Sequence, residues 1–136
     1  MSGVRLFGRL ALFVVYFWFG LLKVVTDSPA NPLVEALLKK TLPFVTFDHF
    51  IVGFGILEMV IGILFLFPRL TKWALLILLL HMATTIMPLF LLPAIAWQGW
   101  FVPTLEGQYM IKNLVIIALA LSLLPESWNS RTRLFS

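Results

Sequence analysis

The sequence predicts an all-α integral membrane protein, a four-helix bundle that forms a single transmembrane domain over residues 1–136. The chain is 61% hydrophobic and only 12% charged, whereas soluble domains are nearer half apolar and about a quarter charged. Its apolar residues fall into four runs of about the length that crosses the hydrocarbon core of a bilayer. Backbone groups in lipid must be satisfied within their own segment, so each run is expected to be a helix.

The four expected spans are Leu6–Val25, Phe50–Phe67, Trp73–Leu92 and Tyr109–Leu124. The first apolar run is too long for a typical signal peptide, so we expect a retained span. In Asn31–Phe44 apolar residues recur at helical spacing, Pro32 suits a first turn and Pro43 a stop. This pattern predicts a short interfacial helix in the first outer loop. The aromatic segment Pro93–Gln108 predicts a loop pressed into the membrane interface or folded over the mouth of the bundle.

Basic residues indicate the orientation of the bundle. They lie before span one, in the turn between spans two and three, and in the C-terminal tail: Arg5, Arg9, Arg69, Lys72, Arg131 and Arg133. An even number of spans puts all of them on one side, which the positive-inside rule makes the cytoplasm. Both termini are therefore expected to be cytoplasmic. Basic residues scattered at segment ends are typical of topology signals, so the bilayer and not nucleic acid is the expected partner.

Glu58 stands near the middle of a membrane span, where a carboxyl must be protonated, paired or facing a wet cavity. At 1.5 Å per residue, Glu58 lies roughly 12 Å and His81 roughly 16 Å from the outer ends of their helices. Spans two and three are joined by a tight turn, so contact between these two side chains is expected. Lys23 and Lys112 lie near the outer ends of spans one and four, and either can snorkel outward or reach toward Glu58.

Each span carries one polar stripe, and the economical arrangement points all four stripes into the bundle. The stripes comprise Tyr16, Gly20 and Lys23; Gly55, Glu58 and Gly62; His81, Thr84, Thr85 and Pro88; and Tyr109, Lys112 and Asn113. The glycines at 20, 55 and 62 are expected to let helices pack closely. The candidates for ligand binding or proton exchange are Glu58, His81, Lys23, Lys112, Tyr16 and Asn113. A purely structural role stays open for each, since intramembrane Lys and His also serve as anchors or satisfied core groups.

The sequence argues against several kinds of chemistry. The chain has no cysteine, which removes disulfides, thiolate nucleophiles and iron–sulfur ligation. Its histidines, His49 and His81, are not at ligand spacing, so neither a metal site nor a covalently bound cofactor is expected. No catalytic residue can be assigned, and the chain is not expected to be an enzyme on its own.

Two short motifs carry a resemblance to a known family. Phe19–Gly20–Leu21–Leu22–Lys23 ends span one, and the segment from Gly55 to Gly62 places Glu58 between glycines. With these motifs the chain resembles the DoxX-like family of small four-helix membrane proteins. The resemblance implies a multi-pass protein in the cytoplasmic (inner) membrane of a prokaryote, with Gly20, Lys23, Glu58 and Gly62 as the matching positions. The long aromatic outer loop departs from the family pattern.

Members of that family are associated with quinone-linked oxidation, with terminal oxidases or with oxidative-stress complexes. Three functional hypotheses follow from the residues together with this resemblance. The first is an accessory subunit of a larger respiratory or redox membrane complex. The second is a quinone-interacting oxidoreductase component, in which Glu58, His81 and Lys23 bind the head group and exchange its protons while a partner supplies electrons. The third is a small-solute or proton carrier with Glu58 in the path.

Overall fold

The computed structural model describes residues 3–25 and 31–124, and this part of the chain is mostly helical. Its long helices are α1 (Gly3–Val24), α3 (Phe47–Phe65), α4 (Thr71–Ile86) and α7 (Leu105–Ser122). Its shorter elements are α2 (Asn31–Thr41), the 3-10 turn η1 (Pro68–Leu70), α5 (Pro88–Leu91), α6 (Pro93–Ala96), β1 (Trp97–Gly99) and β2 (Val102–Pro103). The tail arginines Arg131 and Arg133 lie outside the described residues.

Among the described residues, three segments are long and apolar enough to cross a membrane: Gly3–Val24, Phe47–Phe65 and Pro68–Leu91. The predicted helical membrane protein with several spans is therefore supported by length and composition. A fourth span in α7, and the side of the membrane on which the termini lie, stay predictions. The expectation of an all-α chain is wrong in one detail, because β1 and β2 pair antiparallel in a short hairpin.

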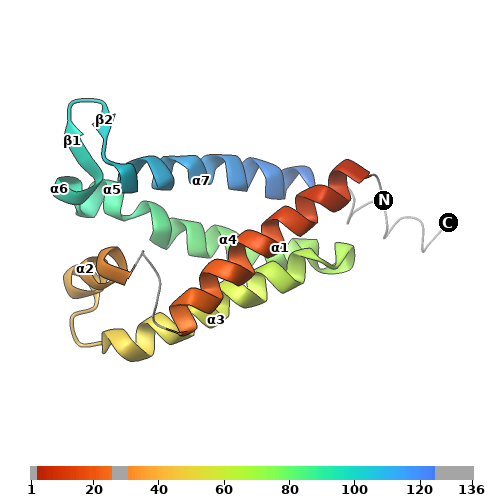
Figure 1. The fold of residues 1–136 in the computed structure, drawn as a ribbon, viewed down its shortest axis with the longest axis horizontal. Coiled ribbons are helices and arrows are strands. Elements are labelled where there is room, and N and C mark those ends of the chain that lie inside the picture. Colours follow the sequence, from red (N-terminus) through yellow and green to blue (C-terminus); the bar gives the residue numbers. More distant parts are fainter. Residues whose placement is uncertain (1–2, 26–30, 125–136) are drawn as a thin grey trace.

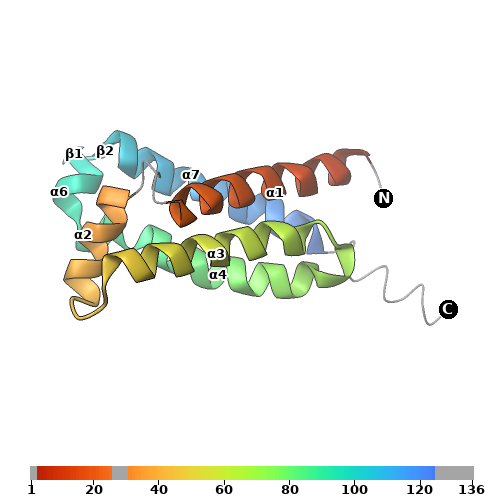
Figure 2. The ribbon, with the colours of Figure 1, turned by 60° about the horizontal axis from the view of Figure 1, so that its bottom comes forward.

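The four long helices run side by side along the long axis of the molecule (Figures 1 and 2). The start of α1, the η1 turn and the end of α7 lie at one end, which we call the basic end because Arg5, Arg69 and Lys72 belong to it. The elements α2, α5, α6 and the hairpin gather at the opposite end, which we call the hairpin end (Figure 1). The basic groups at one end are those on which the expected orientation depends.

Local sequence explains where the helices break. Proline has no N–H to donate and clashes with the preceding turn, so it begins helices and interrupts their interiors. The expected span Trp73–Leu92 is accordingly divided, since α4 ends at Ile86 and Pro88 and Pro93 each open a short new helix. At the start of α7, the Thr104 hydroxyl accepts the N–H of Gly107 at 3.1 Å and caps the helix.

Helix α2 confirms the short helix expected between spans one and two, with bounds Asn31–Thr41. It contacts α3 and α5 at the hairpin end, and Leu38 is its buried residue. Its lysines, Lys39 and Lys40, are exposed. The helix therefore packs on the bundle through its apolar side and turns its charged side away, as an amphipathic surface helix does.

The tightest helix pair is α1 with α3, and glycines make it possible. A Cβ added at Gly55 would lie 2.5 Å from the backbone oxygen of Gly20, and a Cβ at Gly20 would lie 2.5 Å from that of Gly55. A Cβ added at Gly62 would likewise lie 3.1–3.2 Å from backbone atoms of α1. The expected packing role of these three glycines matches this geometry, because backbones this close leave no room for side chains.

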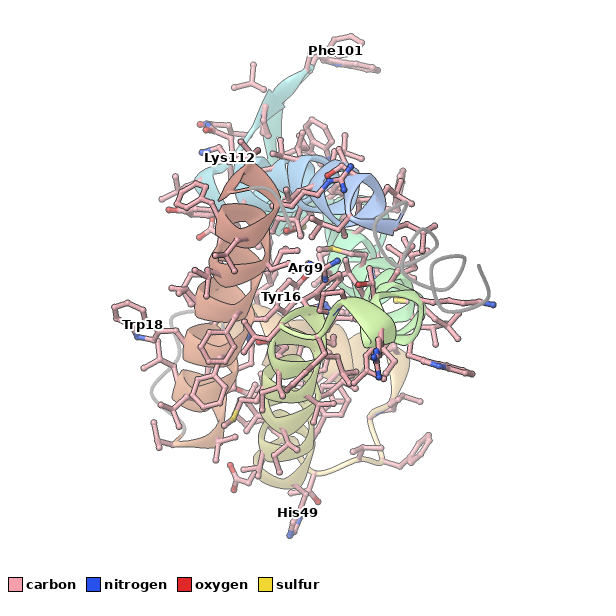
Figure 3. The ribbon with its side chains drawn as sticks, turned by 90° about the vertical axis from the view of Figure 1, so that its right-hand side faces the viewer. Arg9, Tyr16, Trp18, His49, Phe101 and Lys112 are labelled. Atoms are coloured by element: carbon pink, nitrogen blue, oxygen red, sulfur yellow. The ribbon has the colours of Figure 1, made fainter. Side chains whose placement is uncertain are left out.

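Arg9 is the largest residue that is fully buried, at 0% exposure. Its Nη1 donates to the Phe65 carbonyl at 2.9 Å and to Thr71 Oγ1 at 2.8 Å, and its Nη2 donates to the Leu123 carbonyl at 3.5 Å. One guanidinium thus joins α1 to the end of α3, the start of α4 and the end of α7 (Figure 3). It satisfies carbonyls that have no partner within their own helices.

Candidate functional site

Three charged or titratable side chains from three helices meet inside the bundle. Lys23 Nζ on α1 donates to Glu58 Oε2 on α3 at 2.9 Å, and the two side chains are only 8% and 5% exposed. Glu58 Oε1 lies 3.0 Å from Nε2 of His81 on α4, and the His81 side chain is 6% exposed. The Glu58–His81 contact expected from the sequence is therefore formed, and Lys23 completes it. We call these three residues the buried triad.

Aromatic rings surround the buried triad. Phe54 stacks on the His81 ring with centroids 4.8 Å apart, and it lies 5.8 Å from Lys23 Nζ. Tyr16 approaches the other side of His81 edge-on at 5.7 Å. Phe50 stacks on Phe54 at 5.5 Å, one turn nearer the hairpin end. These rings exclude water from the polar atoms, so the Lys23–Glu58 attraction acts in a medium of low dielectric constant.

His81 is hydrogen-bonded through its ring nitrogen Nε2 and its backbone carbonyl, while its other ring nitrogen has no partner among the described residues. The hydroxyls of Thr84 and Thr85 donate to the His81 carbonyl at 2.6 and 3.0 Å, as expected for threonines within a helix. The ring nitrogen Nδ1 is buried and has no hydrogen-bond partner in the part of the chain that the structure describes. With Nε2 bonded to a carboxylate, a neutral ring offers Nδ1 as an acceptor. The site therefore contains a base or acceptor atom that is oriented but unused.

Tyr16 belongs to the wall of the site and not to its ion pair. Its side chain is buried, and its hydroxyl lies 4.0 Å from Met82 Sδ. The predicted stripe of Tyr16, Gly20 and Lys23 is buried along α1, and that of Gly55, Glu58 and Gly62 along α3. Three of the four predicted stripes thus point inward.

The fourth stripe does not point inward, and this expectation is wrong. Tyr109 and Lys112 are exposed, and Asn113 is half-buried. Lys112 Nζ lies 5.4 Å from the centre of the Tyr109 ring, one helical turn toward the hairpin end, and Figure 3 shows Lys112 away from the interior. The rotation of α7 follows from Gly107, which packs on the backbone of Ala96 with no room for a Cβ. Lys112 therefore lies along its own helix, against Tyr109, and not beside Glu58.

Sequence reasoning counted the charge of Arg9 only as a topology signal and missed its place in the interior of the bundle. A signal was present in the spacing. Arg9, Leu12, Tyr16, Gly20 and Lys23 recur every three or four residues and are all buried on α1. Residues at this spacing share one helix face, so Arg9 belongs to the same stripe as Lys23.

Comparison with protein-family models, curated proteins and solved structures finds no match to this chain. The resemblance to the DoxX-like family accordingly stays a prediction. Within the described residues no group of three His, Cys, Asp or Glu side chains is placed to hold a metal ion. The chemistry that can be argued is therefore that of the buried triad itself.

Proposed function

We propose that the chain is a subunit of a larger respiratory or redox assembly in the cytoplasmic membrane of a prokaryote, and that the buried triad holds and exchanges a proton there. The Lys23–Glu58–His81 contact carries the proposal. Lys23 balances the charge of Glu58, so a proton taken up at His81 changes the net charge of a dry site by one. Buried titratable groups of this kind mark proton pathways in membrane proteins.

The lack of redox ligands in the sequence supports a role as a subunit. The chain has no cysteine and two histidines, and His49 is exposed at the start of α3 while His81 is buried on α4. Electrons that accompany a proton at the buried triad would come from another subunit or from the substrate. The topology proposed with this function has four spans, α7 being the fourth, and cytoplasmic termini beside the basic end. The respiratory setting rests on the DoxX-like resemblance.

A quinone-interacting component is the second candidate, and one observation favours it. His81 Nδ1 is a buried acceptor without a partner, and the rings of Phe54 and Tyr16 flank it. A quinol hydroxyl that donated to Nδ1 would satisfy this atom, and the flanking rings suit an aromatic head group.

Native mass spectrometry after mild detergent extraction from the native membrane tests the subunit proposal. We expect a defined assembly in which this chain is present at fixed stoichiometry with other subunits. A lone chain or a homo-oligomer would contradict the proposal. A bound mass of quinone size, retained by the wild type and weakened by Glu58→Gln, would support the second candidate.

Histidine NMR tests the proton site separately, because the chain has only two histidines and His49 serves as an exposed internal control. We expect His81 to be neutral, with its proton on Nε2 and Nδ1 bare. A charged ring would place a second N–H donor at Nδ1, where no acceptor is found among the described residues. Glu58→Gln should change the ¹⁵N shifts of His81 and leave those of His49 unchanged. His81 shifts that do not respond to Glu58→Gln would contradict the proposed role.

A further inference from the structure

The hairpin of β1 and β2 projects sideways from the bundle, and nothing in the buried triad requires this. It projects across the direction of the long helices and not along it, so its tip extends past the flank of α7 (Figure 1). The view along the bundle axis shows the same projection, with Phe101 far from the helix interior (Figure 3). A tip placed this way lies beside the end of the bundle, at the level where the helices end.

The hairpin is held firmly to the bundle. The indole Nε1 of Trp97 donates to the Leu89 carbonyl at 2.9 Å. The Thr104 N–H donates to the Ala96 carbonyl at 2.8 Å, and the Thr104 hydroxyl to that of Ile95 at 2.5 Å. Trp97 and Trp100 are both aromatic residues of the outer loop, but Trp97 is bonded to the bundle and anchors the hairpin. The bonds fix the base of the hairpin and leave its tip outside the protein.

The tip consists of large apolar side chains with no internal contact to cover them. Trp100 is 92% and Phe101 is 91% exposed, and neither Gly99 nor Val102, which flank them, carries a charge. Phe101 has a φ of 57°, a left-handed backbone conformation that bulky residues rarely adopt. This conformation closes the tight turn between β1 and β2 and leaves both aromatic side chains outside the protein.

We propose that Trp100 and Phe101 insert into the lipid interface at the hairpin end and anchor this end of the bundle in the membrane. Aromatic side chains concentrate at the boundary between headgroups and hydrocarbon, where an apolar ring is buried and an indole N–H stays hydrated. Three helices of the bundle are long and apolar enough to cross a membrane, so we infer that this boundary lies near the ends of those helices. The sideways projection of the hairpin then carries its tip over neighbouring lipid and not into water.

The surface below the hairpin favours lipid over a protein partner as the occupant. Helix α7 exposes large apolar side chains on more than one side, among them Leu105, Leu114 and Val115 at 62%, 61% and 69%. The hairpin tip is uncharged, and the exposed charged residues of α7 nearest to it are Glu106 and Lys112. Lys112 bends along α7 toward the hairpin end, as a lysine does when it reaches for the headgroup layer.

The absence of cysteine from the chain makes a direct test simple. Single variants Phe101→Cys, Lys40→Cys and Leu80→Cys are labelled with a nitroxide and reconstituted in vesicles of phosphatidylethanolamine and phosphatidylglycerol. Lys40 is an exposed charged position on α2, and Leu80 is a 66% exposed apolar position on α4. Collision of each label with oxygen, which partitions into lipid, and with a water-soluble nickel chelate is measured by electron paramagnetic resonance.

We expect the label at position 101 to collide with oxygen severalfold more than the Lys40 label does, and with the nickel chelate severalfold less. The Leu80 label gives the collision rates expected for a label exposed to lipid. Chelate access equal to that at Lys40 would place the tip in water and overturn the proposal. Shielding from both reagents would mean that protein, such as a second copy of the chain, covers the tip, and this would overturn it as well.

Discussion

Replacing Glu58 by Gln is expected to lower the free energy of unfolding by about 3–5 kcal/mol, the usual cost of breaking a buried ion pair by removing one partner. The amide leaves the Lys23 ammonium, which is 8% exposed, without its counter-charge. Unfolding by sodium dodecyl sulfate in mixed micelles, followed by circular dichroism, measures the change. The double variant Lys23→Met with Glu58→Gln should be more stable than the sum of the single effects predicts, because it leaves no unpaired charge.

The exposed pair of Glu35 and Lys39 on α2 is a matched control. These side chains are 46% and 75% exposed and lie 3.4 Å apart at i,i+4 spacing. Glu35→Gln should therefore change the stability by no more than about 0.5 kcal/mol. If Glu58→Gln costs no more than Glu35→Gln, the buried triad does not hold the bundle together. Its proposed charge balance would then be wrong.

The arrangement of the buried triad could largely be predicted from the sequence. Helical periodicity puts Tyr16, Gly20 and Lys23 on one face, and the tight turn before α4 puts His81 opposite Glu58. A carboxyl in an apolar span also has few ways to be satisfied. The pairing with Lys23, left open between snorkelling and reaching inward, is settled by the close approach of α1 and α3 at Gly20 and Gly55.

The features that the sequence did not reveal depend on contacts between distant segments. The rotation of α7 is set by Gly107 against Ala96, a contact that no helical period encodes. The hairpin lacks the Asn-Gly or Asp-Gly signal of a two-residue turn and uses Phe101 at positive φ instead. The role of Arg9 requires the ends of three other helices to meet at one point, so its charge alone suggested only orientation.

Gly55→Ala is expected to destabilise the bundle by about 1–3 kcal/mol, the range for inserting a methyl group into a packed core. The added Cβ would lie 2.5 Å from the Gly20 carbonyl oxygen and 2.9 Å from the Lys23 Cβ. The neighbour that must move is backbone, so α1 and α3 have to separate. The same detergent unfolding measurement gives the size of the effect.

Gly53→Ala is the matched control, because it lies on the same helix and a Cβ there meets nothing within 4 Å. Alanine is favoured over glycine in a helix by about 1 kcal/mol, so Gly53→Ala should be neutral or stabilising. Equal effects of the two substitutions would contradict close packing at Gly55.

The glycine contact and the ion pair should also be coupled. Lys23 lies three residues after Gly20 on α1, and Glu58 lies three residues after Gly55 on α3. Helices that separate at the glycines therefore also draw Lys23 Nζ away from Glu58 Oε2. Gly55→Ala should therefore cost less in a Glu58→Gln background than in the wild type, with a coupling energy of about 0.5–3 kcal/mol. Additive effects would mean that the pair tolerates separation of the helices. A positive coupling would show that the glycines are what allow a lysine and a glutamate from two helices to neutralise each other inside the bundle.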